Sequence, residues 1–523
     1  MTSTQFQSEP FSNVDAAWLH MDTPTNLAVI TGVLSFADPL DFTRLKITIQ
    51  NRLLLFSRFR QRVVEPRGIL GLPRWEVDPH FDLDYHLQRL RLPDPGDHET
   101  LQRFVSDLMS VPLDQSRPLW QFYYVENYTQ GCALVTRLHH CIADGIALMQ
   151  ILLSLADESP DEAMFEVQED FEVEISPLAR LFIPGIRAAR SVVRVVKRTG
   201  ALIHEGMDVL THPANLTEVI HLSTRSSKAL GKLLFILPDQ KTIFKGKCGI
   251  PKRAVWSIAI EMNEVKAISQ RMGGTINDIL LSAITGALRR YLEGRGEPVD
   301  GLDIRTLVPV NLRPKGELDQ LGNRFGLVFL SLPIGIRDPV KRLMMLKRRM
   351  DAIKTSREAV VAISILGFIG MTPVQIERII TTIFGMKGTA VMTNVPGPNK
   401  PLYLAGQPIR SMMFWVPTPA NLSLGVSILS YAGNVILGVA TDVEMVPDPE
   451  KILDAFQEEF ADLSRWGRPP HRVGAAVRIE KIDLAQDESH EVAITCQALT
   501  KTGKPCKNPA LPGFTTCYVH RGQ

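Results

Sequence analysis

The most informative residues of this chain are consecutive and read Leu138-His139-His140-Cys141-Ile142-Ala143-Asp144-Gly145. Two histidines, an aspartate and a glycine at these offsets arise by chance in roughly one chain in a thousand of this length. A neutral imidazole titrates near physiological pH, so it can take a proton from a hydroxyl while that hydroxyl attacks a thioester. The pattern therefore indicates an acyl-transfer active site.

The residues that precede the motif separate the two histidines. Cys132 to Leu138 alternate as in a strand, so His139 and His140 face opposite sides if the strand continues. Only one of them can then be the general base, and we assign that role to His140. Cys141 faces away from His140 by the same rule, so it is a poor candidate nucleophile and no covalent acyl-enzyme is expected.

Asp144 has two interpretations. It precedes the apolar helical stretch Gly145 to Leu153, so it could serve only as the N-cap of that helix. Alternatively its carboxylate could pair with an arginine and hold the turn that aims the imidazole of His140; the sequence does not identify such a partner. We place His139, Asp144 and Gly145 beside His140 in the candidate catalytic set.

The motif resembles that of the acyl-CoA-dependent acyltransferases with a chloramphenicol acetyltransferase-like fold, and peptide-synthetase condensation domains carry it too. Other segments narrow the resemblance to the bacterial wax ester synthase/diacylglycerol acyltransferase family, over approximately residues 8 to 465. The segments that carry this resemblance are Asp114 to Trp120, Thr275 to Leu281, Val308 to Arg313, Leu321 to Arg324, and Thr393 to Pro398.

The resemblance implies an α/β fold of two mixed-sheet domains with a channel between them. It implies an O-acyltransferase that moves a long-chain acyl group from acyl-CoA to a fatty alcohol, to diacylglycerol, or to both. The product would be a wax ester or triacylglycerol. Hydrogen-bond donors to the developing oxyanion are expected near the base, but the sequence does not identify them.

The supporting segments also have structural interpretations. Thr275 and Asp278 have the spacing of a capping box, which explains Asp278 without catalysis. Asn277 suits a helix's first turn poorly unless it makes a contact, and the resemblance places it near the channel. Pro118, Leu119 and Trp120 are expected to shape core packing, although Trp120 could line the acyl channel. Thr393 to Pro398 are expected to form a rigid turn that borders the pocket or locks the domains.

The chain of 523 residues is too long for one core and predicts several domains. Strand and helix signals alternate through both halves. We divide the chain into an N-terminal half with the histidine motif (1–157), an acidic loop with a basic amphipathic crossover (158–253), a C-terminal half (254–470), a linker (471–495) and a small tail module (496–523).

Composition is that of an ordinary globular enzyme, with 45% hydrophobic and 22% charged residues. A net charge of +2 gives no reason to expect nucleic acid as a partner of the core. The start resembles no signal peptide, and the apolar run Ala359 to Met371 is too short to span a bilayer. We expect a cytoplasmic protein. The basic stretch within Ser176 to Leu210 leaves open either peripheral attachment to the inner membrane or lipid droplets, or a solvated helix over the domain junction.

The cysteines form two groups. Cys132, Cys141 and Cys248 are scattered through the enzyme-like part and are expected to be buried. The tail gathers three cysteines and a histidine, which is a ligand set for a closed structural zinc site: Cys496, Cys506, Cys517 and His520. A solvated tail with incidental thiols is the alternative. No cofactor is expected for catalysis.

Three rival functions remain. A polyketide-type acyltransferase would prefer a carrier-bound donor, and kinetics with free acyl-CoA would separate it. A condensation-type enzyme would use the same motif on a carrier-bound donor, and carrier domains would be expected beside it. A non-catalytic lipid-surface protein would use the basic segment and the tail for binding, and the intact histidine motif argues against it.

Overall fold

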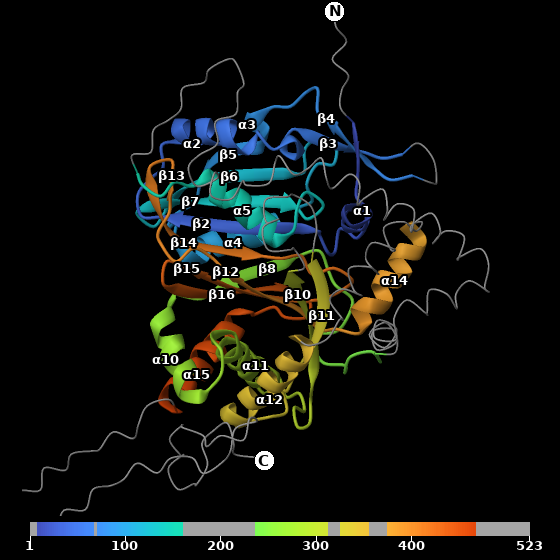
Figure 1. The fold of residues 1–523 in the computed structure, drawn as a ribbon, viewed down its shortest axis with the longest axis vertical. Helices are drawn as coiled ribbons and strands as arrows, with labels where there is room; N and C mark the ends of the chain where they lie inside the picture. Colours follow the sequence, from blue (N-terminus) through green and yellow to red (C-terminus); the bar gives the residue numbers. More distant parts are fainter. Residues whose placement is uncertain (1–7, 67–70, 161–235, 312–324, 355–373, 467–523) are drawn as a thin grey trace, which may run out of the picture.

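The computed structural model describes residues 8–66, 71–160, 236–311, 325–354 and 374–466. Two mixed β-sheets organise these residues and lie one above the other in Figure 1. The α/β fold expected from the alternating elements is confirmed. A small sheet lies next to the upper one, in the strand order β1-β4-β3, with bounds Glu9–Pro10 for β1, Arg74–Val77 for β4 and Gln61–Val64 for β3.

The upper, N-terminal sheet has the strand order β13-β14-β2-β7-β6-β5 in the described part of the chain. Its central strands β2 and β7 are buried along their whole length, because side chains pack on both faces of the sheet. The bounds are Tyr403–Leu404 (β13), Gln407–Trp415 (β14), Val29–Phe36 (β2), Gly131–His139 (β7), Trp120–Tyr128 (β6) and Leu87–Arg91 (β5).

The lower, C-terminal sheet has the order β11-β10-β12-β15-β16-β8, and the short strand β9 pairs with β16. Parallel pairing joins β10 to β12 and β12 to β15, while the other pairs are antiparallel. The bounds are Phe325–Leu332 (β11), Ile304–Asn311 (β10), Ala390–Pro396 (β12), Leu424–Tyr431 (β15), Asn434–Asp442 (β16), Lys252–Trp256 (β8) and Ile260–Glu261 (β9).

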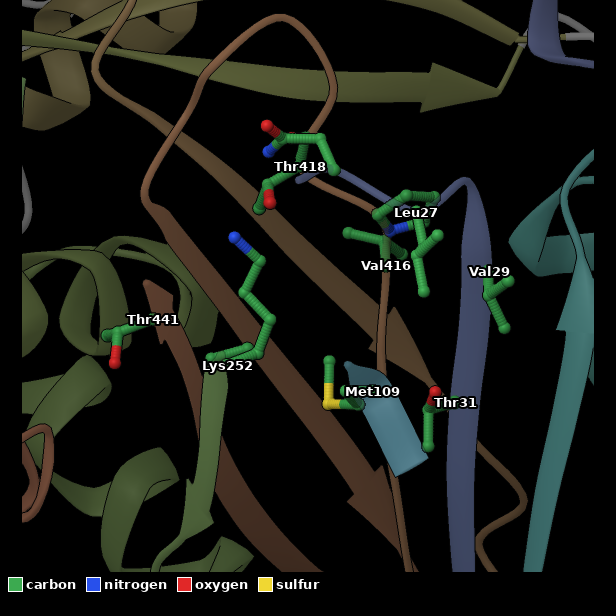
Figure 2. A pocket seen from close by; sticks show the side chains of 11 residues that line it. Leu27, Val29, Thr31, Met109, Lys252, Val416, Thr418 and Thr441 are labelled. Atoms are coloured by element: carbon green, nitrogen blue, oxygen red, sulfur yellow. The ribbon is translucent and has the colours of Figure 1, made fainter. Parts of the chain in front are cut away.

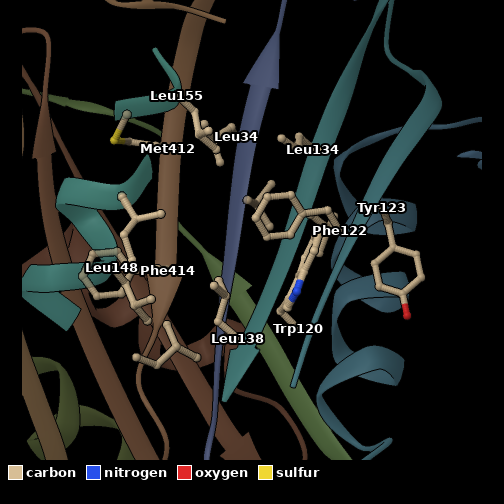
Figure 3. Close-up of a cluster of buried hydrophobic side chains, with 14 of the residues drawn as sticks. Leu34, Trp120, Phe122, Tyr123, Leu134, Leu138, Leu148, Leu155, Met412 and Phe414 are labelled. Carbon is tan, nitrogen blue, oxygen red and sulfur yellow. The ribbon is translucent and has the colours of Figure 1, made fainter. Parts of the chain in front are cut away.

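Helices cover the two sheets. In Figure 1, α5 lies against the upper sheet, and α10, α11, α12 and α15 lie below the lower one. Figure 3 shows side chains of α5 facing those of β2, β7 and β14, with Trp120 and Phe122 of β6 in the same cluster. The bounds are Asn13–His20 (α1), Phe42–Thr48 (α2, continued by a π-helix at Ile49–Leu53), Leu83–His86 (α3), His98–Met109 (α4), Gly145–Leu155 (α5), Met262–Met272 (α10), Ile276–Gly294 (α11), Pro339–Lys354 (α12), Val374–Met386 (α14) and Glu450–Trp466 (α15).

A strand from the C-terminal half joins the N-terminal sheet, which the linear division of the chain did not anticipate. Residues 254–470 were assigned to the C-terminal half, yet β14 pairs with β2 and extends the N-terminal sheet. Trp415 lies opposite Thr31 in this pairing. The strand β14 ends in four consecutive buried apolar residues, Met412 to Trp415, and such a pattern does not reveal which sheet a strand joins.

Helix α4 makes a second junction between the halves. The hydroxyl of Ser106 accepts a hydrogen bond from the Ala254 N–H at 2.9 Å, and that of Ser110 accepts one from the Lys252 N–H at 2.9 Å. These contacts cover the exposed edge of β8 with a helix from the other half, so the open edge of the lower sheet is protected.

Several sequence expectations lie outside the described residues. The zinc ligand set at 496–523, the linker at 471–495, most of the crossover at 158–253 and the motif at 321–324 belong to this group. The metal site and lipid attachment through the crossover stay predictions. None of the helices in the described ranges combines the length and apolar character needed to cross a bilayer.

A buried charge network ties α12 to α15. The guanidinium of Arg342 is fully buried, pairs with the carboxylate of Glu459 and also donates to the Ser282 carbonyl at 3.1 Å. Glu459 accepts a second hydrogen bond from Arg290 at 2.6 Å. Burial lowers the pKa of Arg342, and the charge of Glu459 opposes that shift. This carboxylate therefore compensates a guanidinium that cannot reach water.

We predict that Glu459→Ala destabilises the protein by about 3–5 kcal/mol, since it leaves the buried Arg342 charge uncompensated. The neighbouring Glu458→Ala is the matched control. Its side chain is 64% exposed and pairs with Arg290 at the surface, so the expected loss is about 0–1 kcal/mol. Urea unfolding followed by circular dichroism measures both, and equal losses would contradict the role given to Glu459.

Candidate active site

The histidine motif forms a turn between β7 and α5; we call residues 139–144 the histidine turn. Strand β7 ends at His139, whose N–H donates to the Leu119 carbonyl at 3.0 Å. The N–H of His140 donates to the Ala28 carbonyl at 2.8 Å. The neighbouring strand segments on both sides therefore hold the backbone of the turn, and α5 begins directly after it at Gly145.

The imidazole of His140 lies between aromatic rings from both halves of the molecule. It stacks on Trp18 of α1 with ring centroids 3.9 Å apart and an angle of 18° between the planes. Phe325, the first residue of β11, lies 5.5 Å away on a tilted plane. His140 is only 4% exposed. The candidate base is therefore placed at the junction of the two sheets, in largely apolar surroundings.

His139 has different neighbours, as expected for residues that face opposite sides. Its Nδ1 accepts a hydrogen bond from the Cys141 N–H at 3.1 Å. Because Nδ1 is an acceptor, a neutral ring carries its proton on Nε2, which lies 3.7 Å from a carboxylate oxygen of Asp22. Both ring nitrogens of His139 are thus directed at protein groups, which favours His140 as the base.

Asp144 caps α5, so the N-cap interpretation is confirmed. Its Oδ1 accepts a hydrogen bond from the Ala147 N–H at 3.0 Å, and its carbonyl accepts one from the Leu148 N–H at 2.8 Å. An arginine partner for Asp144 stays a prediction. A Cβ added at Gly145 would meet no atom of the described residues within 4 Å. Packing in this part of the chain therefore does not explain the glycine.

Asn277 and Asp278, in the first turn of α11, make different contacts. Thr275 and Asp278 form the predicted capping box of α11, with the Asp278 carboxylate 2.9 Å from the Thr275 N–H. Asn277 accepts a hydrogen bond from the Asn394 side chain at 2.8 Å. Residues 393–396, predicted as a turn, form the end of strand β12, so the expectation of a turn was wrong there. This strand end and the start of β11 at Phe325 lie at the same end of the lower sheet.

The segment Pro118-Leu119-Trp120 is part of the core, as favoured. All three residues are buried. The indole N–H of Trp120 donates to the Phe59 carbonyl at 2.9 Å, and its ring stacks on His86 with centroids 4.5 Å apart. Nothing in these contacts gives Trp120 a direct role in catalysis.

A small pocket, partly open to solvent, lies between the two halves. Figure 2 shows side chains of β2, α4, β8 and the segment after β14 around it. Val29 on its wall pairs with His139 across the sheet, so the pocket lies next to the histidine turn. Its lining is mixed, with apolar Leu27, Val29, Met109 and Val416 and polar Thr31, Lys252, Thr418 and Thr441.

Two family models match the chain in its own order. The catalytic domain of wax ester synthase/diacylglycerol acyltransferase matches residues 11–280, and the C-terminal domain of the same family matches residues 321–464. The first match covers more than half of the chain and includes the histidine turn. The chain belongs to the wax ester synthase/diacylglycerol acyltransferase family.

Curated relatives agree with this family. The protein named "Probable diacylglycerol O-acyltransferase tgs1" from Mycobacterium tuberculosis is 28% identical over 423 residues, which are 80% of this chain and 86% of that protein. A second protein of this organism, named "Probable diacylglycerol O-acyltransferase tgs2", is 27% identical over 415 residues, or 78% of this chain and 87% of that protein.

Solved structures share the fold at lower identity. The wax ester synthase/diacylglycerol acyltransferase from Marinobacter aquaeolei VT8 superposes with a TM-score of 0.62 at 20% identity, covering 88% of this chain and 99% of that one. The first condensation domain of the calcium-dependent antibiotic synthetase gives a TM-score of 0.54 at 12% identity, covering 89% and 97%. The two-domain, chloramphenicol acetyltransferase-like architecture expected for the family is confirmed.

Sequence reasoning missed three residues that touch the histidine turn: Trp18, Asp22 and Phe325. Each is far from the motif along the chain, and its contact depends on how strands and halves pack. A tryptophan in a short helix and an aspartate after it are common features, so neither pattern by itself indicates this family's site. Among the described residues, no cluster of three or more histidine, cysteine or acidic side chains could hold a metal ion.

Cys141 is the nucleophile that a covalent mechanism would need, and its environment disfavours that mechanism. The side chain is buried, and burial raises the pKa of its thiol well above the ordinary value. Little thiolate is therefore present at neutral pH. Cys132 and Cys248 are also buried free thiols, and burial raises the pKa of each to about 11.

We predict that Cys141→Ala retains acyl transfer, because the thiol has no part in the reaction. Turnover with acyl-CoA should stay within about threefold of the parent protein, a change small compared with the loss of a reacting group. Mass spectrometry should also find Cys141 unmodified when the folded protein is treated with iodoacetamide. A loss of activity in a folded variant would contradict this prediction.

Proposed function

We propose that this chain transfers a long-chain acyl group from acyl-CoA to the hydroxyl of diacylglycerol or a fatty alcohol, with His140 as the general base. The observation that carries the proposal is the placement of His140: a buried imidazole at the junction of the two halves, inside the family's catalytic domain. The names of the mycobacterial relatives support diacylglycerol as one acceptor.

The reaction needs one base and no covalent intermediate. An unprotonated nitrogen of His140 takes the hydroxyl proton while the acceptor oxygen attacks the thioester carbonyl carbon. The tetrahedral intermediate then collapses, the carbon–sulfur bond breaks, and the imidazolium returns the proton to the departing CoA sulfur. The products are an ester and free CoA, and His140 is restored.

The surroundings of His140 support this role. Trp18 and Phe325 flank its ring and keep it out of bulk water, which would otherwise compete with the acceptor for the acyl group. His139 has its nitrogens directed at Cys141 and Asp22, so it is less available to a substrate. The small pocket between the halves is lined by both apolar and polar side chains.

We predict that His140→Ala lowers turnover by at least about 100-fold, the smaller end of what a positioned general base contributes. The measurement is CoA release from palmitoyl-CoA with hexadecanol, with dipalmitoylglycerol and with no acceptor. The matched control is His80→Ala, whose side chain is exposed, and it should behave as the parent protein.

Three outcomes separate the alternatives. Release that depends on an acceptor and is lost in His140→Ala supports the proposal and ranks the two acceptors. Near-full turnover in a folded His140→Ala protein would sink the assignment of the base. Absence of release from the folded parent protein with either acceptor would contradict acyl-CoA as donor and favour a carrier-bound donor or a binding role.

A further inference from the structure

The loop between α1 and β2 holds the histidine turn through one carboxylate. Asp22 lies in this loop, and its Oδ1 accepts a hydrogen bond from the Ala28 N–H at 2.6 Å. The carbonyl of Ala28 in turn accepts the N–H of His140 at 2.8 Å. This first arm connects Asp22 to the backbone of the candidate base through a single residue.

A second arm runs through the other histidine. The Oδ2 atom of Asp22 lies 3.7 Å from Nε2 of His139, and Nδ1 of His139 accepts the Cys141 N–H at 3.1 Å. The two arms therefore end on the backbone N–H groups of His140 and Cys141. These groups lie on the two sides of the Cα atom that carries the imidazole of His140. Together they close a ring of contacts around His140.

Burying the carboxylate of Asp22 costs free energy, so its contacts with the protein are needed to offset that cost. Its side chain is only 10% exposed. A buried carboxylate needs donors or a cation; Ala28 N–H supplies the hydrogen bond, and Nε2 of His139 lies 3.7 Å away, within ion-pair reach. Arg137, on the same strand as His139, supplies charge: burial lowers the pKa of this guanidinium, and the charge of Asp22 opposes the shift.

A negative Asp22 also selects one form of the His139 ring. A carboxylate near Nε2 favours the proton on that nitrogen, which leaves the Nδ1 lone pair for the Cys141 N–H. The opposite tautomer would set an N–H of His139 against the N–H of Cys141. The backbone after His140 would then lose its acceptor, and the turn could relax.

We propose that Asp22 is a positioning residue for His140, acting through Ala28 and His139. The inference rests on the proposed function, since it assigns a supporting residue to the base named there. Asp22 holds the peptide on both sides of His140 and does not itself touch the reacting atoms. Its removal should therefore slow the chemical step and leave substrate binding largely intact.

The test is Asp22→Asn. The single amide oxygen can still accept the Ala28 N–H, but an NH₂ group then replaces the carboxylate oxygen that faces Nε2 of His139. We expect kcat to fall by about 10- to 100-fold, because misplacing a reacting group by about 1 Å can cost 100-fold. The KM for palmitoyl-CoA and for the acceptor should stay within about twofold, as for a loss confined to the transition state.

The matched control is Asp41→Asn. The Asp41 carboxylate also accepts backbone N–H groups, from Thr43 at 2.8 Å and Arg44 at 3.1 Å, but it caps α2 and has no contact with the turn. Its kcat should equal that of the parent protein. A kcat loss in both variants would indicate general damage to the N-terminal half and would overturn the specific role of Asp22.

A double variant shows whether Asp22 acts through His139. If it does, Asp22→Asn should cost much less in the His139→Gln background than in the parent protein, since the second arm is already lost. Losses that multiply in full would contradict this route. If Asp22→Asn does not fold, His139→Gln is tested in its place. We then expect a lower kcat and an unchanged KM. An unchanged kcat would overturn the proposal.

The outcomes separate this inference from the proposed function. Near-full turnover by a folded His140→Ala protein would contradict the assignment of His140 as the base, whatever the kcat of Asp22→Asn. An inactive His140→Ala protein together with a parent-like kcat in Asp22→Asn would leave the function standing and overturn only the positioning role.

Discussion

Pairing of β14 with β2 is the interaction on which the rest of the structure depends. It sets a strand from the C-terminal half into the N-terminal sheet, so the two halves share a backbone ladder and cannot separate without breaking it. This pairing sets β2 between β14 and β7. The Ala28 carbonyl just before β2 is thereby held in place for His140, and Phe325 can reach the same imidazole from the lower sheet.

Burial on both faces explains the character of the histidine turn. Because β7 is buried along its whole length, each polar group at its end needs a partner inside the protein. The N–H groups of His139, His140 and Cys141 each have one. The same burial keeps the Cys141 thiol protonated, so the turn presents an imidazole as its reactive group.

The site is consistent with a family that works on water-insoluble substrates. Trp18 and Phe325 flank the imidazole of His140, and they keep this side chain out of bulk water. The first condensation domain of the calcium-dependent antibiotic synthetase shares this two-domain architecture at only 12% identity. The fold alone therefore does not specify the acceptor.

Local patterns in the sequence were enough for the histidine motif and for several elements, although the end of β12 was predicted as a turn. The strand before His139, the N-cap at Asp144 and the capping box of Thr275 and Asp278 all depend on neighbours within a few residues, so their spacing predicts them. Order of motifs along the chain was likewise enough for the family and its two-domain fold.

Only the tertiary structure decided which distant residues meet. The structure joins β14 to the N-terminal sheet, stacks Trp18 on His140 and places Asp22 against Ala28 and His139. These contacts connect segments that share no period or spacing in the sequence. They arise when the apolar surfaces of the two halves are buried. Because the hydrophobic effect is non-directional, no local sequence pattern specifies which segments it brings together. The sequence by itself therefore determined the histidine motif and the family, whereas packing determined which distant residues surround His140.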